Sequence, residues 1–416
     1  MDNINKTVLP SGIKVISEYL PHVQSFSLGF WFNVGSENET PENNGISHFI
    51  EHMLFKGTKK RSPRKIADEI ESLGGYLNAF TSKEHTCYYG RGLGRHIKKT
   101  FEVLSDMVLE SVFKESEIRK EAAVIIDELN DIEDSPEELI FDKFESSIYE
   151  GNTIGYPIIG TEENILSFTR NDFLKYYGEN YTLQNFSIVA SGDVDHNRLV
   201  ELVLKYFGKI ESRNSPGKNE IRLNSGADQY VYKDIQQSHI ILGTTTCGYR
   251  DKERIIVNLL SHILGEGSSS RLFQSVREKN GIAYQINTFL NSYYSTSTFG
   301  VYYSTGDKMV EKALGLILRE FDRIKEKPVS DKELKRAKEY LKGSILMGME
   351  NTTNRMVRIA QSEIYFNKDK TVEESITEIN SVTKEDIFKA ANELLDPLKL
   401  KKAVISPKNH LLVSVA

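Results

Sequence analysis

The sequence contains few cysteines, no long apolar run and no block of one charge. Only Cys87 and Cys247 occur in 416 residues, which excludes a disulfide framework and fits a reducing compartment. Both fall in strand-like runs, where we expect small buried side chains. No stretch approaches the roughly 18 consecutive apolar residues of a membrane-spanning helix, so no membrane partner is expected. The first residues also lack a secretory signal pattern, and we therefore expect a cytoplasmic protein.

A strongly basic segment is also missing. The net charge is −6 with the two signs interspersed, and the basic clusters at 56–65 and 323–328 are short. Clusters of this length are typical of solvated loops, so no nucleic-acid partner is expected.

The length exceeds what one hydrophobic core usually serves, which predicts two domains of about 200 residues each. The segment 211–229 is polar, contains Gly, Pro and Asn, and has little apolar periodicity. We therefore predict a linker at 213–226 between an N-terminal domain, 1–212, and a C-terminal domain, 227–416.

The two halves repeat one another. The expected helix at 48–58 aligns with 258–268 at a shift of 210 residues, and the helix at 113–129 aligns with 329–345 at a shift of 216. Strand pairs that return without a helical crossover favour antiparallel sheets. We therefore predict an α+β fold of two duplicated domains, each a mostly antiparallel sheet with helices packed on it.

One short motif can hold a metal ion. His48, Glu51 and His52 are spaced i, i+3 and i+4, which places all three side chains on one face of a helix. Two imidazoles one turn apart can bind the same ion. The segment contains residues that can begin and end such a helix, namely Asn44 or Ser47 at its start and Gly57 at its end.

A catalytic zinc site commonly uses two histidines, one glutamate and a water. Two glutamates in the second helix, Glu121 and Glu128, are seven residues apart and therefore lie on nearly the same face. We expect one to bind the metal and the other to support it, because a carboxylate among apolar residues needs a partner. Periodicity alone does not choose between them. We expect one zinc ion per chain, although the same ligand types also accept manganese or cobalt.

Glu51 lies beside the expected metal but is not needed as a ligand. Zinc lowers the pKa of a bound water to about 7 and polarises a carbonyl. Glu51 can then take a proton from the attacking water and pass it to the leaving nitrogen, as a general base in peptide hydrolysis.

The second half supports a functional reading of the cluster. At the equivalent positions it has Asn258, Ser261 and His262 for the motif, and Ala337 and Ser344 for the two glutamates. Since the same scaffold lacks four of the five groups, the fold does not require them. We expect the remaining His262 to be a core histidine with its hydrogen bonds satisfied.

The HFIEH motif, followed by Glu128 76 residues after His52, resembles the inverted-motif zinc peptidases of the pitrilysin, insulin-degrading enzyme and mitochondrial processing peptidase family, M16. Segments 156–165, 179–195 and 268–284 extend the likeness over essentially the whole chain. The resemblance implies Glu128 as the third metal ligand and Glu121 as its supporting acid. It also implies that the two domains form half of a clamshell.

Two substrate-binding elements follow from the same resemblance. The segment 73–82 resembles the family's exposed edge strand, which would pair with an extended peptide through Asn78, Ala79 and Phe80. Arg277 and Tyr284 resemble a pair that binds the substrate backbone and stabilises the oxyanion.

In the family, four such domains enclose a chamber, and this chain has two. The resemblance therefore implies a homodimeric zinc endopeptidase of unfolded peptides in which Arg277 and Tyr284 of one protomer serve the metal site of the other. The alternatives are a catalytic subunit that needs a different partner chain and a noncatalytic core subunit of a larger assembly. Retention of the whole metal motif weakens the noncatalytic alternative. The segment GEGSSSRLF, 265–273, lacks the glycine run of the noncatalytic processing subunit, which favours a self-sufficient enzyme.

Overall fold

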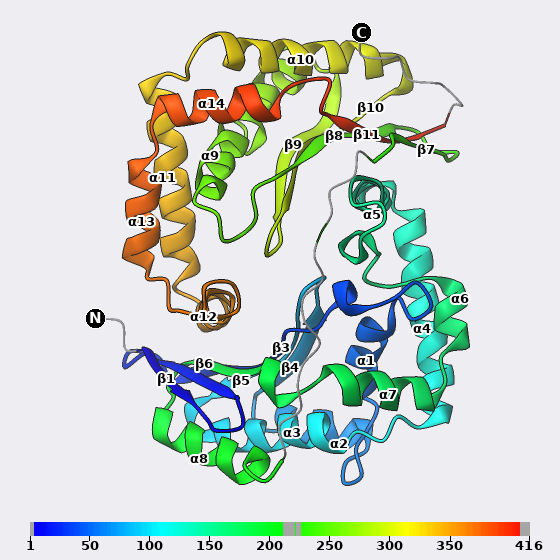
Figure 1. The fold of residues 1–416 in the computed structure, drawn as a ribbon, viewed down its shortest axis with the longest axis vertical. Helices are drawn as coiled ribbons and strands as arrows, with labels where there is room; N and C mark the ends of the chain where they lie inside the picture. The colour runs from blue at the N-terminus through cyan, green and yellow to red at the C-terminus, as the bar shows by residue number, and fades with distance from the viewer. Residues whose placement is uncertain (1–3, 211–220, 222–225, 408–416) are drawn as a thin grey trace. The chain divides into compact units, whose positions relative to one another are not determined.

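The computed structural model describes residues 4–210, 221 and 226–407. The chain divides into two compact units (Figure 1). The first unit comprises Met1–Asn130, Tyr156–Glu220 and Met347–Thr371, and the second comprises Asp131–Gly155, Ile221–Leu346 and Val372–Ala416.

These units differ from the predicted domains 1–212 and 227–416, because each half contributes a helical segment to the other unit. An amphipathic helix pattern predicts that one face is buried, but it does not predict which sheet buries it. Apart from residues 221 and 226, the predicted linker lies outside the described residues.

The first unit contains a six-stranded sheet of order β1-β2-β6-β3-β5-β4. All neighbouring strands are antiparallel except β2 and β6. The strands are β1 (Ile4–Val8), β2 (Lys14–Tyr19), β3 (Ser25–Phe32), β4 (Tyr76–Thr81), β5 (Thr86–Leu93) and β6 (Phe186–Gly192). Strand β4 is therefore an edge of the sheet, as the segment 73–82 predicts.

The second unit contains a five-stranded sheet of order β7-β11-β8-β10-β9, in which only β7 and β11 are parallel. Its strands are β7 (Gln229–Tyr232), β8 (Ser238–Thr246), β9 (Ala283–Ser292), β10 (Ser297–Thr305) and β11 (Lys401–Ser406). The order and directions match those of β2-β6-β3-β5-β4 in the first sheet. The predicted duplication and the largely antiparallel α+β fold are thus confirmed.

Helices cover both faces of the first sheet. They are α1 (Ile46–Leu54), α2 (Pro63–Glu71), α3 (Ile97–Glu110), most of α4 (Glu115–Asp134), α6 (Glu162–Ser167), α7 (Arg170–Asn180), α8 (His196–Phe207) and α12 (Thr352–Phe366). The Phe30 ring points to one face, where it meets Phe101 of α3 and Phe207 of α8. Its neighbour Gly29 faces Met356 of α12 on the other side. Helices α3 and α8 therefore lie opposite α12 (Figure 1).

Helix α12 is tied to the first sheet by charged groups. Glu363 binds Lys6 and Lys14 at 2.7 Å each, and Arg355 forms an ion pair with Glu18. A helix from the C-terminal half of the chain thereby completes the core of the first unit.

The second unit is built in the same way. Its helices are α5 (Pro136–Ile148), α9 (Glu253–Gly265), α10 (Val310–Glu326), most of α11 (Asp331–Gly348), α13 (Val372–Ser381) and α14 (Lys384–Leu394). Phe144 of α5 lies against Gly243 of β8, in a cluster with Ile241 and Ile405. Helix α5 therefore covers a face of the second sheet, as α12 covers a face of the first.

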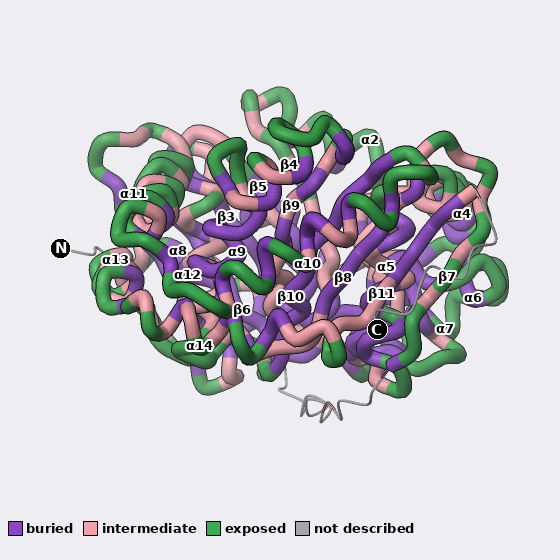
Figure 2. Tube along the Cα trace, turned by 90° about the horizontal axis from the view of Figure 1, so that it is seen from above, coloured by how far each residue is buried: buried purple, intermediate pink, exposed green. Residues whose placement is uncertain are grey.

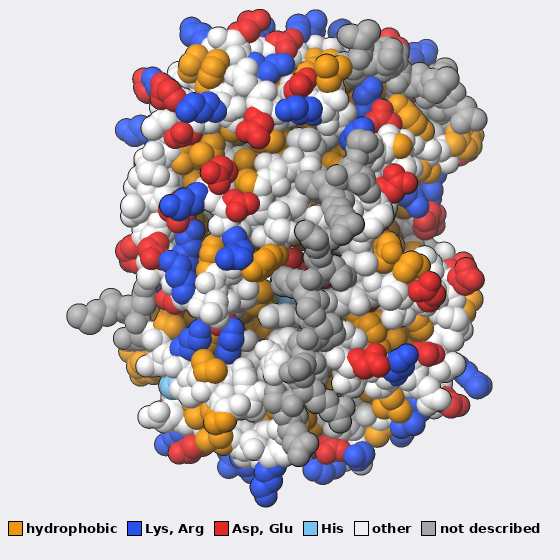
Figure 3. Space-filling model, in the orientation of Figure 1, with side chains coloured by type: hydrophobic (Ala, Val, Ile, Leu, Met, Phe, Trp, Pro, Cys, Tyr) orange, Lys and Arg blue, Asp and Glu red, His pale blue; other side chains and the backbone are white. Residues whose placement is uncertain are grey.

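Burial follows this layering. The central strands of both sheets are buried, whereas the outer turns of the helices are exposed (Figure 2). Cys87 is buried in β5, as predicted, and Cys247 directly after β8 is half-buried. Basic and acidic side chains are interspersed on the face drawn in Figure 3. None of the helices in the described part of the chain has the length and apolar character that crossing a bilayer requires.

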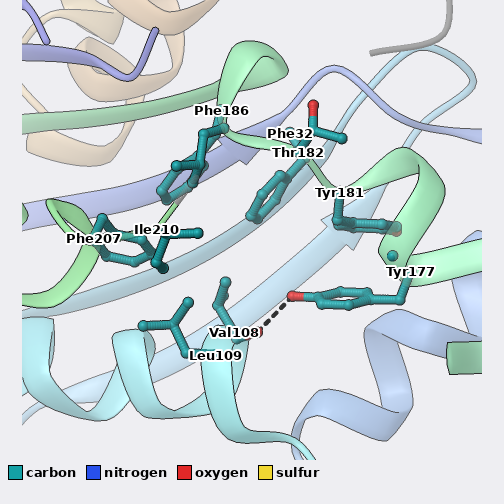
Figure 4. A pocket seen from close by; sticks show the side chains of 11 residues that line it. Phe32, Val108, Leu109, Tyr177, Tyr181, Thr182, Phe186, Phe207 and Ile210 are labelled. Carbon is teal, nitrogen blue, oxygen red and sulfur yellow. Dashed lines mark hydrogen bonds between the residues drawn. The ribbon is translucent and has the colours of Figure 1, made fainter. Parts of the chain in front are cut away.

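An aromatic pocket of about 430 Å³ lies between α3, α7 and α8 in the first unit (Figure 4). The Tyr177 hydroxyl donates to the Val108 carbonyl at 2.8 Å beside it. Its walls are apolar side chains, tyrosines and a threonine, with no carboxylate or imidazole. The groups that can perform acid–base or metal chemistry lie elsewhere in this unit.

Candidate metal centre

The helix that carries the predicted motif begins at a glycine. Gly45 is the N-cap of α1 with φ of 101°, and a Cβ there would lie 2.6 Å from the Ile159 carbonyl oxygen. The buried Glu39 carboxylate accepts the N–H groups of Gly45 and Ser47, both at 2.8 Å. The prediction of Asn44 or Ser47 as the cap was therefore wrong, because a more distant carboxylate binds the free N–H groups. Burial raises the pKa of Glu39, although these hydrogen bonds oppose the shift.

Helix α1 places His48 and His52 side by side, with ring centroids 4.7 Å apart. The Nε2 atoms of His48 and His52 lie 3.8 and 3.7 Å from the two carboxylate oxygens of Glu128. Among the described residues, these three form the one group of three or more His, Cys, Asp or Glu whose ligand atoms all lie within 4.8 Å of one another.

These separations suit a zinc ion. Two ligand atoms at about 2.0–2.1 Å from a tetrahedral ion are about 3.4 Å apart. Two imidazole nitrogens and a carboxylate are also the ligand types of a catalytic zinc site with one open position. The three side chains therefore fit the metal that the sequence predicts.

Glu121 and Glu128 play different parts in the structure. Glu121 is buried, with its side chain 6% exposed, and its carboxylate lies 2.9 Å from His52 Nδ1 and 2.6 Å from Lys56 Nζ. Burial would raise the pKa of Glu121, but the hydrogen bonds from His52 and Lys56 lower it. The side chain of Glu128 is 44% exposed. The expectation that both carboxylates are buried was therefore wrong for Glu128, which reaches the histidines from the solvent side.

His48 is held as a neutral imidazole. Burial and repulsion from His52 lower the pKa of His48 to about 3. A neutral ring keeps a nitrogen lone pair available for a metal. Its Nδ1 atom has no hydrogen-bond partner within the described part of the chain.

Glu51, on the same helix as the two histidines, contacts the edge strand of the sheet. Its Oε2 accepts a hydrogen bond of 2.6 Å from Thr81 Oγ1, at the last residue of β4. Burial raises the pKa of Glu51, while Thr81 and His52 oppose the shift and Glu128 adds to it. Thr81 thus fixes one oxygen of the Glu51 carboxylate.

The predicted substrate residues Asn78, Ala79 and Phe80 lie on the edge strand β4. The Ala79 N–H donates to Asn78 Oδ1 at 2.9 Å, and the Asn78 amide donates to the Tyr76 hydroxyl at 2.6 Å. Because an N–H that bonds its own neighbour's side chain is not part of the β5 ladder, the Ala79 backbone points off the free edge. Strand β4 is thus the edge of the sheet in the described part of the chain, and a peptide that pairs with it would displace Asn78 Oδ1 from the Ala79 N–H.

Arg277 and Tyr284 belong to the second unit. Arg277 lies in a short π-helical turn, Phe273–Glu278, with its guanidinium 4.8 Å above the Phe273 ring. Tyr284 is at the start of β9 and is 68% exposed. Their contribution to a shared metal site stays a prediction.

The second copy of the motif helix is α9. Its His262 is buried, as predicted, and stacks on Tyr340 with ring centroids 4.2 Å apart. However, its Nδ1 has no hydrogen-bond partner among the described residues, and the Glu266 carboxylate is 3.6 Å away. The prediction of satisfied hydrogen bonds was therefore wrong; aromatic stacking holds this ring.

Two further residues contact the centre, Lys56 through Glu121 and Thr81 through Glu51. Lys56 lies one turn after His52, so its helical spacing could have pointed to it. Thr81 falls within the predicted edge strand 73–82. Its hydrogen bond with Glu51 depends on the packing of β4 against α1, which the sequence does not predict.

Two family models match this chain. Residues 14–162 match the family model of insulinase, peptidase family M16, and residues 167–341 match that of the peptidase M16 inactive domain. The second match covers much of the half that lacks the metal ligands.

Similar proteins span nearly the whole chain. A protein of Streptomyces coelicolor named an uncharacterized zinc protease is 34% identical, over 96% of this chain and 91% of its own. The protein YmxG of Bacillus subtilis, with the same description, is 34% identical over 98% of this chain and 99% of its own.

Two solved structures share the fold. A protease from Helicobacter pylori matches with a TM-score of 0.91 at 21% identity, over 98% of this chain and all of that one. A peptidase M16 inactive domain from Pseudomonas fluorescens matches with a TM-score of 0.89 at 18% identity, over 98% of both chains. With relatives at 34% identity over almost its full length, the chain belongs to the insulinase family of peptidases, M16.

Proposed function

We propose that this protein is a zinc-dependent endopeptidase that cleaves unfolded peptides. One observation carries the proposal: three ligand atoms, from His48, His52 and Glu128, converge within 4.8 Å beside a glutamate, Glu51, that is not among them. The names of the relatives, which describe zinc proteases, support zinc as the metal.

Zinc, when bound, would make water a nucleophile near neutral pH and polarise the scissile carbonyl. His48, His52 and Glu128 would hold the ion. Glu51 acts as the general base: its Oε1 takes a proton from the attacking water and delivers it to the leaving nitrogen. Burial of this carboxylate favours the transfer, because burial raises its pKa and so makes it a stronger base.

The substrate is an extended peptide added to the edge of β4. Main-chain hydrogen bonds to Ala79 would align the peptide, while the side chains of Asn78 and Phe80 would contact its residues. A folded domain seldom offers a free strand, so the preferred substrates are unfolded or short polypeptides.

The active form is a homodimer. Arg277 and Tyr284 of one protomer supply hydrogen-bond donors to the substrate backbone and to the developing oxyanion in the metal site of the other. The exposure of Tyr284 is compatible with such a role.

A mass-spectrometric digest of an unstructured peptide pool tests the chemistry. The protein should cleave the pool, and a chelator should abolish cleavage, with recovery when zinc is added. Glu51→Gln should bind about one zinc per chain and cleave nothing, because the ligands remain and the base is lost. Cleavage that persists in Glu51→Gln would remove this residue from its role.

Mixing inactive protomers tests the shared site. Glu51→Gln protomers mixed with Tyr284→Phe protomers should regain activity, because a mixed dimer contains one intact site. No recovery despite proven subunit exchange would contradict sharing. Zinc binding without cleavage by the native protein would instead favour a noncatalytic subunit or one that needs a different partner chain.

A further inference from the structure

A second depression lies on the first sheet, at the opposite end of β4 from Thr81. It has a volume of about 460 Å³ and is formed by β3, β4, β5 and the start of α12. Tyr76 pairs with Arg91 across the two strands, and Tyr89 lies two residues from Arg91. All three side chains therefore point to the same face of the sheet.

Arg91 is the charged residue of this pocket. Its lining otherwise consists of glycines, apolar and aromatic side chains and hydroxyl groups, without a carboxylate. Arg91 is exposed, and no acidic group within the described residues forms an ion pair with it. A guanidinium with no partner beside a hollow is available to an external anion.

The other polar groups of the pocket can also donate. The Tyr76 hydroxyl accepts the Asn78 amide at 2.6 Å and shares a hydrogen bond with the Tyr89 hydroxyl, which leaves one of the two phenol hydrogens for another acceptor. Burial and the contact with Tyr76 raise the pKa of Tyr89 to about 12, so its phenol keeps its proton at neutral pH. The rings of Tyr76 and Tyr89 meet edge to face, with centroids 6.1 Å apart.

We propose that this pocket is a specificity subsite for an acidic side chain of the peptide. A carboxylate accepts hydrogen bonds only, and it would here meet a guanidinium and the one phenol hydrogen that the Tyr76–Tyr89 hydrogen bond leaves over. The inference rests on the proposed function, since it assumes that a substrate strand lies along β4.

The geometry also predicts where the acidic residue lies in the substrate. Thr81 marks the end of β4 beside Glu51, and Tyr76 lies five residues earlier. A paired strand advances about 3.3 Å per residue, in step with β4. We therefore expect the acid four to six residues from the bond that is cleaved.

The first measurement is the residue preference in the peptide digest. Asp and Glu should be enriched over Lys and Arg four to six residues from the cleaved bonds, on one side of them. Synthetic peptides with Glu, Gln or Lys at that position should differ in kcat/KM. The value for the Glu peptide should be about fivefold to tenfold higher than that for the Gln peptide. The preference should weaken at high salt, because the pocket is open to solvent.

A charge reversal gives the sharper test. Arg91→Glu should favour the Lys peptide, and Arg91→Ala should bring the Glu to Gln ratio to about one. Arg95→Ala removes another exposed arginine that does not line the pocket, and it should keep the native preference. An increase in kcat/KM of the Arg91→Glu variant for the Lys peptide alone cannot arise from misfolding, because misfolding lowers activity toward every peptide.

Binding separates this inference from the proposed chemistry. Fluorescence anisotropy measures the affinity for each labelled peptide without cleavage. It is carried out with the zinc-loaded Glu51→Gln variant and with the zinc-loaded double variant that also carries Arg91→Glu. If the Glu51→Gln variant binds the Glu peptide most tightly, and the Arg91→Glu change reverses this order of affinities, the subsite is supported even if the native protein cleaves nothing. Equal binding of the Glu, Gln and Lys peptides would overturn the subsite, even if the native protein proves to be a peptidase.

Discussion

The His52 ring presents Nδ1 to the Glu121 carboxylate at 2.9 Å and Nε2 to Glu128 at 3.7 Å. The hydrogen bond to Glu121 places the ring proton on Nδ1 and leaves the Nε2 lone pair facing Glu128. Lys56 Nζ lies 2.6 Å from the other Glu121 oxygen. Glu121 thus orients His52, one of the three candidate metal ligands, without belonging to that group, and Lys56 orients Glu121.

Disrupting this chain of contacts should weaken metal binding. We expect Glu121→Gln to lower zinc affinity about tenfold to a hundredfold, and Lys56→Met about tenfold, because the His52 ring loses its fixed orientation. Competition with a coloured chelator measures the affinity without an activity assay. Lys59→Met is the matched control, since Lys59 pairs with Glu110 away from the centre. Unchanged affinity in Glu121→Gln would show that the ring is held by packing alone.

The two glutamates show where sequence reasoning reaches its limit. Helical spacing correctly brought His48, Glu51 and His52 to one face, and it put Glu121 and Glu128 on a common face of α4. It could not choose between them. Seven residues separate them by about 10 Å along a helix, so the crossing of α4 over α1 decides which one meets the Nε2 atoms.

The sequence also did not predict which segments pack against β3 and against the start of α1. The alternating pattern of β3 predicts a strand with one buried face, but in the structure both faces are buried, one of them beneath α12, more than 300 residues later. Likewise, no residue pattern around Gly45 predicts that Glu39, six residues earlier, accepts the first N–H groups of α1, because the conformation of the intervening loop decides this contact.

Thr81 should affect turnover rather than metal binding. Thr81→Val keeps the shape of the side chain but removes the hydroxyl that donates to Glu51 at 2.6 Å. Without it the carboxylate can rotate, and we expect kcat to fall about tenfold, which corresponds to about 1.4 kcal/mol. Zinc affinity and KM should be unchanged. Thr81→Ser restores the hydroxyl and should recover most of the rate; equal loss in both variants would assign the effect to packing instead.

Gly45 should be essential to the stability of the metal-binding helix. Its φ of 101° disfavours any side chain, and a Cβ would lie 2.6 Å from the Ile159 oxygen. We expect Gly45→Ala to lower the free energy of unfolding by about 1–3 kcal/mol, measured by urea denaturation. Gly178→Ala, in α7, is the control because its Cβ would meet nothing within 4 Å. That change should stabilise the protein slightly, so equal losses in both variants would contradict this account.

Glu333 should make the second unit sensitive to acid. Its carboxylate accepts a 2.9 Å hydrogen bond from Arg271 and bonds of 3.0 and 2.8 Å from the Ser330 N–H and hydroxyl, at the start of α11. Burial alone would raise the pKa of Glu333, but these contacts outweigh it and lower the pKa from 4.5 to about 2. The unfolded chain therefore binds the proton more readily than the folded one.

The sign of the pH effect follows from this depressed pKa. The contribution of Glu333 to stability is fully present above about pH 5 and is lost as the pH falls toward about 2. Glu333→Gln should therefore lower the free energy of unfolding by about 1–3 kcal/mol at pH 7, and the gap to the native protein should close on acidification. Urea denaturation at pH 7, 5 and 3.5, followed by circular dichroism, measures it. Glu339→Gln, whose carboxylate is exposed and pairs with Lys342, should show a much smaller gap. A deficit in Glu333→Gln that stays constant from pH 7 to 3.5 would mean that the ionised carboxylate is not the stabilising form.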